Sequence, residues 1–110
     1  MQIEVNLNEK RIIEKVTNDR FGTFVSKEWK SLIDPYTPRD TGSLMDSVDV
    51  QPFGLHYRQK YADAVYHGEN MNFRKINPYS TYEWDIKAAQ GGQLSKLYRT
   101  LNAGLQSGRF

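Results

Sequence analysis

The feature that most limits how this chain can fold is an apolar stripe in its first third. Its members recur mostly at steps of three and four residues: Ile13, Val16, Phe21, Phe24, Val25, Trp29 and Leu32. This spacing places one apolar face along a helix. Asn8 is suited to cap the start, and Asp34-Pro35 ends the helix because a residue before proline is steered out of the α region. The sequence therefore predicts one long amphipathic helix from about residue 9 to residue 33.

Gly22 lies inside this predicted helix. Glycine costs a helix interior about 1 kcal/mol relative to alanine. We therefore expect either a close packing contact or a bend at this position.

Alternation of polar and apolar side chains indicates strands on both sides of the helix. Residues 2–7 alternate, which predicts a short edge strand. Residues 47–50 and 55–58 alternate as well, and Pro52-Phe53-Gly54 separates them. We expect these two segments to form an antiparallel hairpin.

The C-terminal half contains further helical patterns. Residues 61–66 have helical spacing, and Ser80 with Glu83 forms a capping box that predicts the start of another helix. After Gly91-Gly92 comes an apolar stripe: Leu94, Leu97, Tyr98, Leu101 and Leu105. The predicted fold class is α+β, with a long N-terminal helix, a small antiparallel sheet, and C-terminal helices packed on one face. At this length we expect a single domain, residues 1–110.

Composition excludes several classes of protein. Charged residues make up 25% and hydrophobic residues 38%, which favours a folded chain over a disordered one. There is no cysteine, and His56 and His67 lack the spacing of zinc ligands, so we expect no metal and no cofactor. No apolar run reaches the roughly 20 residues of a membrane span, and the N-terminus lacks the parts of a signal peptide. We expect a soluble intracellular protein without membrane partners.

Charge is unevenly distributed, although the net charge is only +2. From Ile86 onward there are four basic residues and no acidic ones: Lys87, Lys96, Arg99 and Arg109. Such a surface is either a solvated helix face or a face turned towards DNA or an acidic partner. A small basic nucleic-acid-binding or toxin-like domain is therefore one hypothesis.

Asp40-Thr41-Gly42 suggests a second hypothesis, a small dimeric aspartic protease. That chemistry needs two carboxylates that share a proton, and each subunit of a dimer could supply one. The protease signature has large apolar residues directly before the aspartate, whereas this chain has Thr37-Pro38-Arg39. The segment is thus poorly suited to hold a catalytic carboxylate, and we expect no enzymatic activity.

A longer series of motifs spans almost the whole chain. In order, these are Pro38-x-Asp40-Thr41-Gly42-x-Leu44-x-x-Ser47, a strand pair, Tyr61-Ala62-x-x-Val65-Tyr66-x-Gly68, Asn72-Phe73, Asn77-Pro78 and Trp84. Over residues 7–105 this order resembles the minor capsid or head–tail joining (neck, tail-completion) proteins of tailed phages and prophages. Relatives often have a proline directly before the Tyr-Ala pair, where this chain has Lys60.

The resemblance implies a structural virion protein at the head–tail junction, present in the host cytoplasm during assembly. It implies a ring of six or twelve copies that contacts connector, stopper and tail-terminator or tail-tube proteins. Packaged DNA would pass through the centre of such a ring, and subunits of a ring contact one another through two different surface patches.

The resemblance and the distribution of charge together assign expected roles to three groups of residues. The expected structural turn comprises Pro38, Asp40, Thr41, Gly42, Leu44 and Ser47, in which Asp40 caps the turn and Leu44 packs under the sheet. The candidate interface comprises Tyr61, Tyr66, Met71, Asn72, Phe73 and Arg74, although a loop folded onto its own core is an equal alternative. The candidate basic surface, facing the lumen or a partner, comprises Lys87, Lys96 and Arg99.

Overall fold

The computed structural model describes residues 1–14, 16, 18–37, 44, 46–68 and 82–108. Its elements in chain order are β1 (Gln2–Glu4), the 3-10 turn η1 (Glu9–Arg11), α1 (Asp19–Ile33), the 3-10 turn η2 (Asp34–Tyr36), β2 (Val48–Gln51), β3 (Gly54–Tyr57), α2 (Ala62–Tyr66), α3 (Trp84–Gln90) and α4 (Gln93–Gln106). The α+β class is confirmed.

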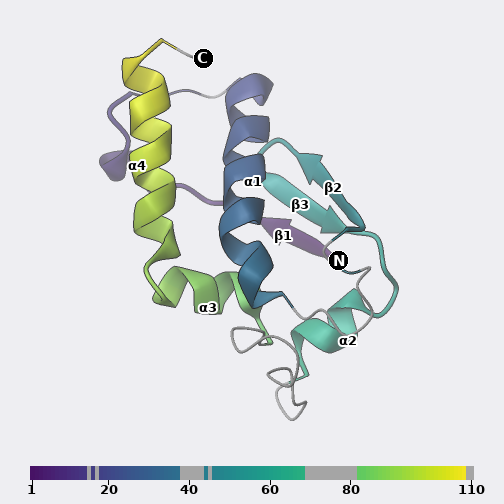
Figure 1. The fold of residues 1–110 in the computed structure, drawn as a ribbon. Helices are drawn as coiled ribbons and strands as arrows, with labels where there is room; N and C mark the ends of the chain where they lie inside the picture. Colours follow the sequence, from purple (N-terminus) through teal and green to yellow (C-terminus); the bar gives the residue numbers. More distant parts are fainter. Residues whose placement is uncertain (15, 17, 38–43, 45, 69–81, 109–110) are drawn as a thin grey trace.

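The three strands form an antiparallel sheet in the order β1-β3-β2. Leu55 at the centre of β3 lies opposite Ile3 on one side and Val50 on the other. The predicted hairpin is confirmed, with Pro52 and Phe53 as its two-residue turn. Helix α1 lies across one face of this sheet, and α4 lies on the far side of α1 (Figure 1). Helix α1 therefore lies between the sheet and α4.

Helix α1 is shorter than the sequence predicts. It begins at Asp19, and the Asn18 side chain caps it by accepting a hydrogen bond from the Phe21 N–H at 2.7 Å. Asn8 does cap a turn, but only the single turn η1, where its side chain accepts from the Lys10 N–H. Among the described residues 9–14, 16 and 18, η1 is the one helical turn, so the predicted helix start at residue 9 was wrong. Ile13 at the start of the apolar stripe is 54% exposed. The end of the helix at Ile33, before Asp34-Pro35, is confirmed.

Two further boundaries differ from the prediction. Strand β1 ends at Glu4, although the Val5 N–H still donates to the Phe53 carbonyl at 2.9 Å. Helix α3 begins at Trp84 with Glu83 as its N-cap in the left-handed region. The predicted capping box would put Glu83 three residues after the cap. Glu83 is instead the N-cap of α3, so that prediction was wrong for Glu83; Ser80 lies outside the described residues.

One hydrophobic core joins the layers. Helix α1 contributes Phe21, Val25, Trp29 and Ile33, one residue per turn, and each is at most 5% exposed. The sheet supplies Leu55 from its central strand, and α4 supplies Leu97 and Leu101. Helix α1 thus packs against the sheet on one side and against α4 on the other. This packing fixes the sheet and α4 on opposite sides of the molecule.

Gly22 and Ser26 join α1 to the turn of the hairpin. The Gly22 carbonyl accepts a hydrogen bond from the Phe53 N–H at 3.1 Å. The buried Ser26 hydroxyl donates to the Gln51 carbonyl at 2.5 Å and accepts from the Gly54 N–H at 2.8 Å. A β-carbon at Gly22 would lie only 2.7 Å from the Phe53 ring. Of the two expectations for Gly22, the close packing contact is the correct one.

Candidate assembly surfaces

Only two residues of the expected structural turn lie within the described part of the chain. Leu44 is buried at 2% exposure, and its carbonyl accepts from the Ser47 N–H. The Ser47 carbonyl accepts from the Arg58 N–H at 2.8 Å, and its hydroxyl accepts from the Gln59 side chain at 3.0 Å. Pro38, Asp40, Thr41 and Gly42 lie outside the described residues, so their expected roles stay predictions.

Among the described residues before Asp40, residues 34–37 do not form a strand. Residues 34–36 form the turn η2, and the buried Thr37 hydroxyl donates to the Ile33 carbonyl at 3.3 Å. An aspartic protease would need an apolar strand here to hold its carboxylate. The described residues before the Asp-Thr-Gly sequence therefore provide no support for that chemistry.

The candidate interface residue Tyr66 packs inside the protomer. Its hydroxyl donates to the Asp85 carboxylate at 2.5 Å, and its ring lies edge-on to Trp84 with centroids 5.0 Å apart. Trp84 in turn donates its indole N–H to the Tyr57 hydroxyl at 3.2 Å. These contacts attach α2 to α3 and β3. The residues involved are distant in the sequence, so their proximity could not be predicted from it.

Burial changes the acidity of both tyrosines in this cluster. Burial raises the pKa of the Tyr57 hydroxyl above its ordinary value of about 10. Burial also raises the pKa of Tyr66, and the hydrogen bond to the Asp85 carboxylate raises it further because it stabilises the protonated hydroxyl. Both groups are therefore neutral hydrogen-bonding groups at physiological pH.

Of the other five candidate interface residues, only Tyr61 lies within the described part of the chain. Tyr61 is half-buried and directly precedes α2. Met71, Asn72, Phe73 and Arg74 lie outside the described residues. The interface role of all six residues, Tyr66 included, stays a prediction.

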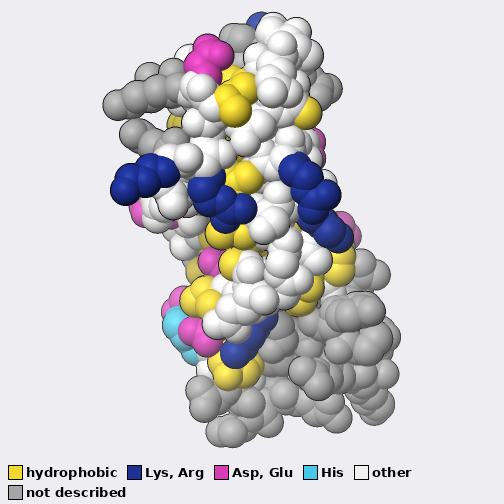
Figure 2. All heavy atoms as spheres, turned by 90° about the vertical axis from the view of Figure 1, so that its left-hand side faces the viewer, with side chains coloured by type: hydrophobic (Ala, Val, Ile, Leu, Met, Phe, Trp, Pro, Cys, Tyr) yellow, Lys and Arg dark blue, Asp and Glu magenta, His cyan; other side chains and the backbone are white. Residues whose placement is uncertain are grey.

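The candidate basic residues lie on the C-terminal helices. Lys96 and Arg99 are exposed on α4, which carries no acidic residue. Figure 2 looks onto the outer face of α4 and shows Lys and Arg side chains in a band across its middle. Lys87 lies on α3, where its ammonium group is 4.9 Å from the centre of the Tyr82 ring.

Sequence patterns missed a part of this face, which we call the N-terminal arm (residues 8–13). The arm lies along α4, and the Asn8 N–H donates to the Tyr98 hydroxyl at 2.6 Å. Asn102 accepts from the Ile13 N–H and donates to the Arg11 carbonyl. The one sequence signal was Asn18-Asp19, a second helix start within the predicted helix.

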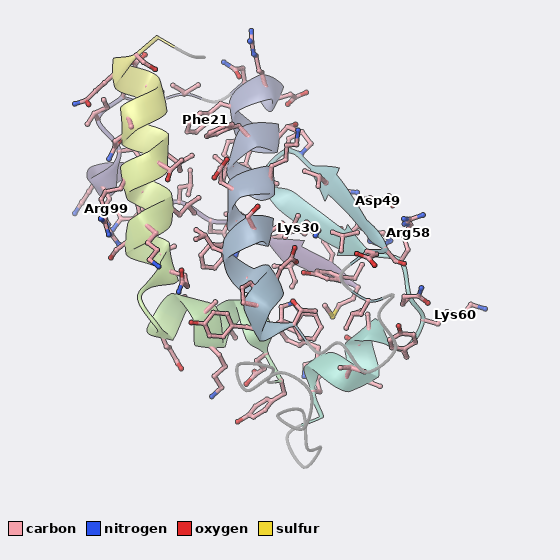
Figure 3. The ribbon with its side chains drawn as sticks, in the orientation of Figure 1. Phe21, Lys30, Asp49, Arg58, Lys60 and Arg99 are labelled. Carbon is pink, nitrogen blue, oxygen red and sulfur yellow. The ribbon has the colours of Figure 1, made fainter. Side chains whose placement is uncertain are left out.

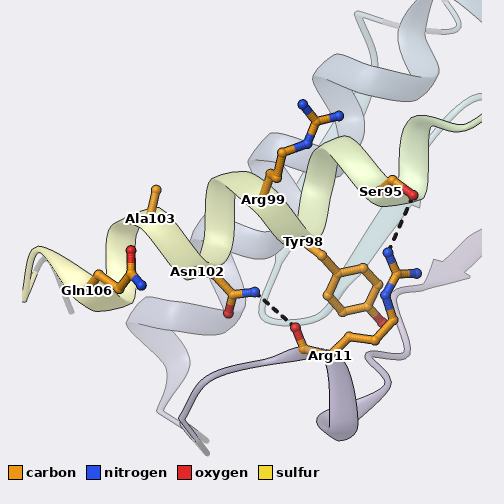
Figure 4. A pocket seen from close by; sticks show the side chains of 7 residues that line it. All are labelled: Arg11, Ser95, Tyr98, Arg99, Asn102, Ala103 and Gln106. Atoms are coloured by element: carbon orange, nitrogen blue, oxygen red, sulfur yellow. Dashed lines mark hydrogen bonds between the residues drawn. The ribbon is translucent and has the colours of Figure 1, made fainter.

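The arm and α4 enclose a cleft of about 580 Å³. Figure 4 shows its lining: Arg11, Ser95, Tyr98, Arg99, Asn102, Ala103 and Gln106. A smaller hollow of about 310 Å³ lies between the end of α1 and the start of α4, where Lys96 and Gln93 contribute to the wall. Both hollows adjoin the candidate basic surface.

The opposite side of the molecule is the edge of the sheet. Among the described strands β2 pairs only with β3. The exposed Asp49 carboxylate on β2 forms an ion pair with Arg58 at 3.3 Å (Figure 3). This sheet edge therefore has both signs of charge, in contrast to α4.

The described residues contain neither a cluster of metal-ligand side chains nor a membrane-spanning helix. No group of three or more His, Asp or Glu side chains among them is placed to hold a metal ion. None of the helices in this part of the chain is long and apolar enough to cross a membrane.

Comparison with known families decides the class of the protein. The family model described as minor capsid protein matches residues 1–105. The chain belongs to the minor capsid protein family of phages. No curated protein and no solved structure matches it.

Membership of the minor capsid family indicates what kind of contact the surfaces of this protein make. Minor capsid proteins are structural components of the virion, so the protein is a phage structural protein. The basic face of α4, the cleft beside it and the edge of the sheet are therefore candidate contact surfaces in a particle.

Proposed function

We propose that this minor capsid protein joins head and tail of a tailed phage as a ring at the neck. The observation that carries the proposal is the family match over residues 1–105, together with the order of motifs that resembles head–tail joining proteins. The ring would contain six or twelve copies and would contact connector, stopper and tail-terminator or tail-tube proteins. Packaged DNA would pass through its centre.

The arrangement of the protomer supports a ring. Copies in a ring meet head to tail, so each needs two different patches on different sides. The outer face of α4 is basic, and the edge of the sheet at β2 lies on the other side of α1 (Figures 1 and 3). The buried side chains of α1 fix the orientation of these two surfaces, which a closed ring requires.

Mass measurement of intact complexes tests the proposal. The protein is measured alone and together with the connector and tail proteins encoded beside it. We expect closed complexes of six or twelve copies, with a central opening in negative-stain images. A protein that stays monomeric in every mixture and is absent from purified virions would overturn the proposal.

A pair of charge-reversed variants makes this test specific to the α4 face. Lys96→Glu changes an exposed residue on that face, and Arg20→Glu changes an exposed residue at the start of α1. We expect the first variant to lower the yield of rings and the second to form rings like the original protein. Equal yields would remove the α4 face from the contact between subunits.

A further inference from the structure

The cleft between the N-terminal arm and α4 has a fixed wall. The arm is attached to Tyr98 through the Asn8 N–H at 2.6 Å and to Asn102 through two hydrogen bonds of 2.9 and 3.0 Å. The two sides of the cleft are about 90 residues apart in the sequence. Since Asn102 uses both its oxygen and its nitrogen in these bonds, it positions the arm rather than a ligand.

Arg11 is held in place at this wall. Its guanidinium group lies over the Tyr98 ring, 4.1 Å from the ring centre, and donates to the Ser95 hydroxyl at 3.4 Å (Figure 4). An arginine held by a ring and one hydrogen bond has further N–H groups available. A group that is already positioned loses less conformational entropy when it binds a ligand.

Arg99 lines the same cleft from α4. In Figure 4 it projects from the side of α4 opposite the arm. Its guanidinium group forms no hydrogen bond or ion pair with any residue that the structure describes, and none of the seven residues lining the cleft is acidic. Two guanidinium groups that line one open cleft from different sides fit an extended ligand with more than one anionic group.

We propose that this cleft binds an acidic peptide segment of a partner protein, with carboxylates paired to Arg11 and Arg99. The planar guanidinium group matches a carboxylate through two parallel hydrogen bonds. Ile13 on the same arm is 54% exposed, and exposed apolar side chains are a common part of protein interfaces. The volume of about 580 Å³ accommodates a few side chains.

Duplex DNA fits these observations less well. A rigid duplex binds through many phosphates spread along its length, which requires an extended track of cations. The basic residues here form one band across the α4 face, and the net charge of the chain is only +2. The proposal does not depend on ring formation.

Binding of fluorescently labelled hexaglutamate to the full chain tests the proposal, with hexaglutamine as the uncharged control. We expect saturable binding of hexaglutamate only. Arg11→Gln and Arg99→Gln should each weaken it about tenfold, which corresponds to the loss of one charge-assisted pair. Arg20→Gln removes the same charge from an exposed position at the start of α1, and this variant should bind like the original protein.

Two comparisons between variants separate loss of a paired carboxylate from displacement of the arm. Arg11→Lys keeps the charge but removes the planar group, so binding between that of the original and of Arg11→Gln supports a paired carboxylate. Arg99→Gln breaks no described contact, which separates loss of ligand binding from displacement of the arm. The proposal is overturned if hexaglutamate does not bind saturably, if Arg20→Gln weakens binding equally, or if a short DNA duplex binds more tightly through the same arginines.

Discussion

At the residue scale, the absence of a side chain at Gly22 determines how the hairpin meets α1. The Phe53 ring occupies the space that a β-carbon would need, and Phe53 itself adopts a positive φ of 54°. That backbone conformation is costly for a residue with a side chain. Packing of Phe53 against Phe21, with ring centroids 6.1 Å apart, offsets this cost.

Gly22→Ala should therefore destabilise the protein although alanine is the better helix former. The new methyl group would lie 2.7 Å from the Phe53 ring, and overpacking of this kind costs about 1–3 kcal/mol. Urea unfolding measures the change. Ser31→Ala at an exposed position of the same helix is the control and should be neutral or slightly stabilising.

A double substitution identifies the cause. In a Phe53→Ala background the ring is gone, so Gly22→Ala should lose most of its penalty. An equal penalty with and without the ring would show that the contact with Phe53 is not responsible.

The buried Tyr57 and the half-buried Tyr66 predict loss of stability at alkaline pH. The pKa of Tyr57 and that of Tyr66 are raised by folding, so above pH about 10 the folded chain keeps protons that the unfolded chain loses. Their contribution to stability is complete below that pH and declines as pH rises through the range between the unfolded and folded pKa values. Urea unfolding at several pH values above 10 should show this decline.

Phenylalanine substitutions test the assignment. Tyr57→Phe and Tyr66→Phe remove the titrating hydroxyls, so the decline with pH should become shallower in each. Tyr57→Phe should also lower stability at neutral pH, because the buried Trp84 N–H loses its acceptor, at a cost of about 1–3 kcal/mol. An unchanged pH dependence in the variant with both substitutions would refute the assignment.

At the element scale, local signals predicted the end of α1 but not its beginning. Asp34-Pro35 ends the helix for a reason that lies within the chain segment itself. The start has a local cap, Asn18, but the residues before it are held by contacts of the N-terminal arm with Tyr98 and Asn102, about 90 residues away. The stripe of apolar residues continued through Ile13 and Val16, whose branched side chains favour a helix only weakly. Periodicity alone could not reveal that the arm turns away to follow α4.

Asn102→Ala should release the arm while the core stays folded. It removes the acceptor of the Ile13 N–H and the donor to the Arg11 carbonyl. Hydrogen exchange should become about tenfold faster at the Ile13 amide, whereas the amides of α1 and β3 should exchange as before.

Gln106→Ala is the matched control. Gln106 lines the same cleft one turn further along α4, and its side chain makes no hydrogen bond with a described residue. It should leave exchange at Ile13 unchanged. If Asn102→Ala also left it unchanged, the arm would be held by other contacts.

At the scale of the whole molecule, the sequence predicted the fold class and the family but only part of the candidate surfaces. Alternation gave the hairpin because each strand has one buried side, and the basic character of α4 follows from composition alone. The cleft beside α4 could not be predicted, because its walls come from opposite ends of the chain. The ring contact of Tyr66 with Trp84 and its hydrogen bond to Asp85 likewise join segments whose proximity is a property of the folded molecule.

The central claim is that the protein sits at the junction of head and tail, and gold-labelled antibodies on purified phage particles test it most directly. The antibody is raised against the folded protein, and particles that lack the gene product serve as the control. We predict label at a single vertex, where the tail joins the capsid, on intact particles or on tails and heads separated at the neck. Label spread over the capsid shell or confined to the far end of the tail would contradict the claim.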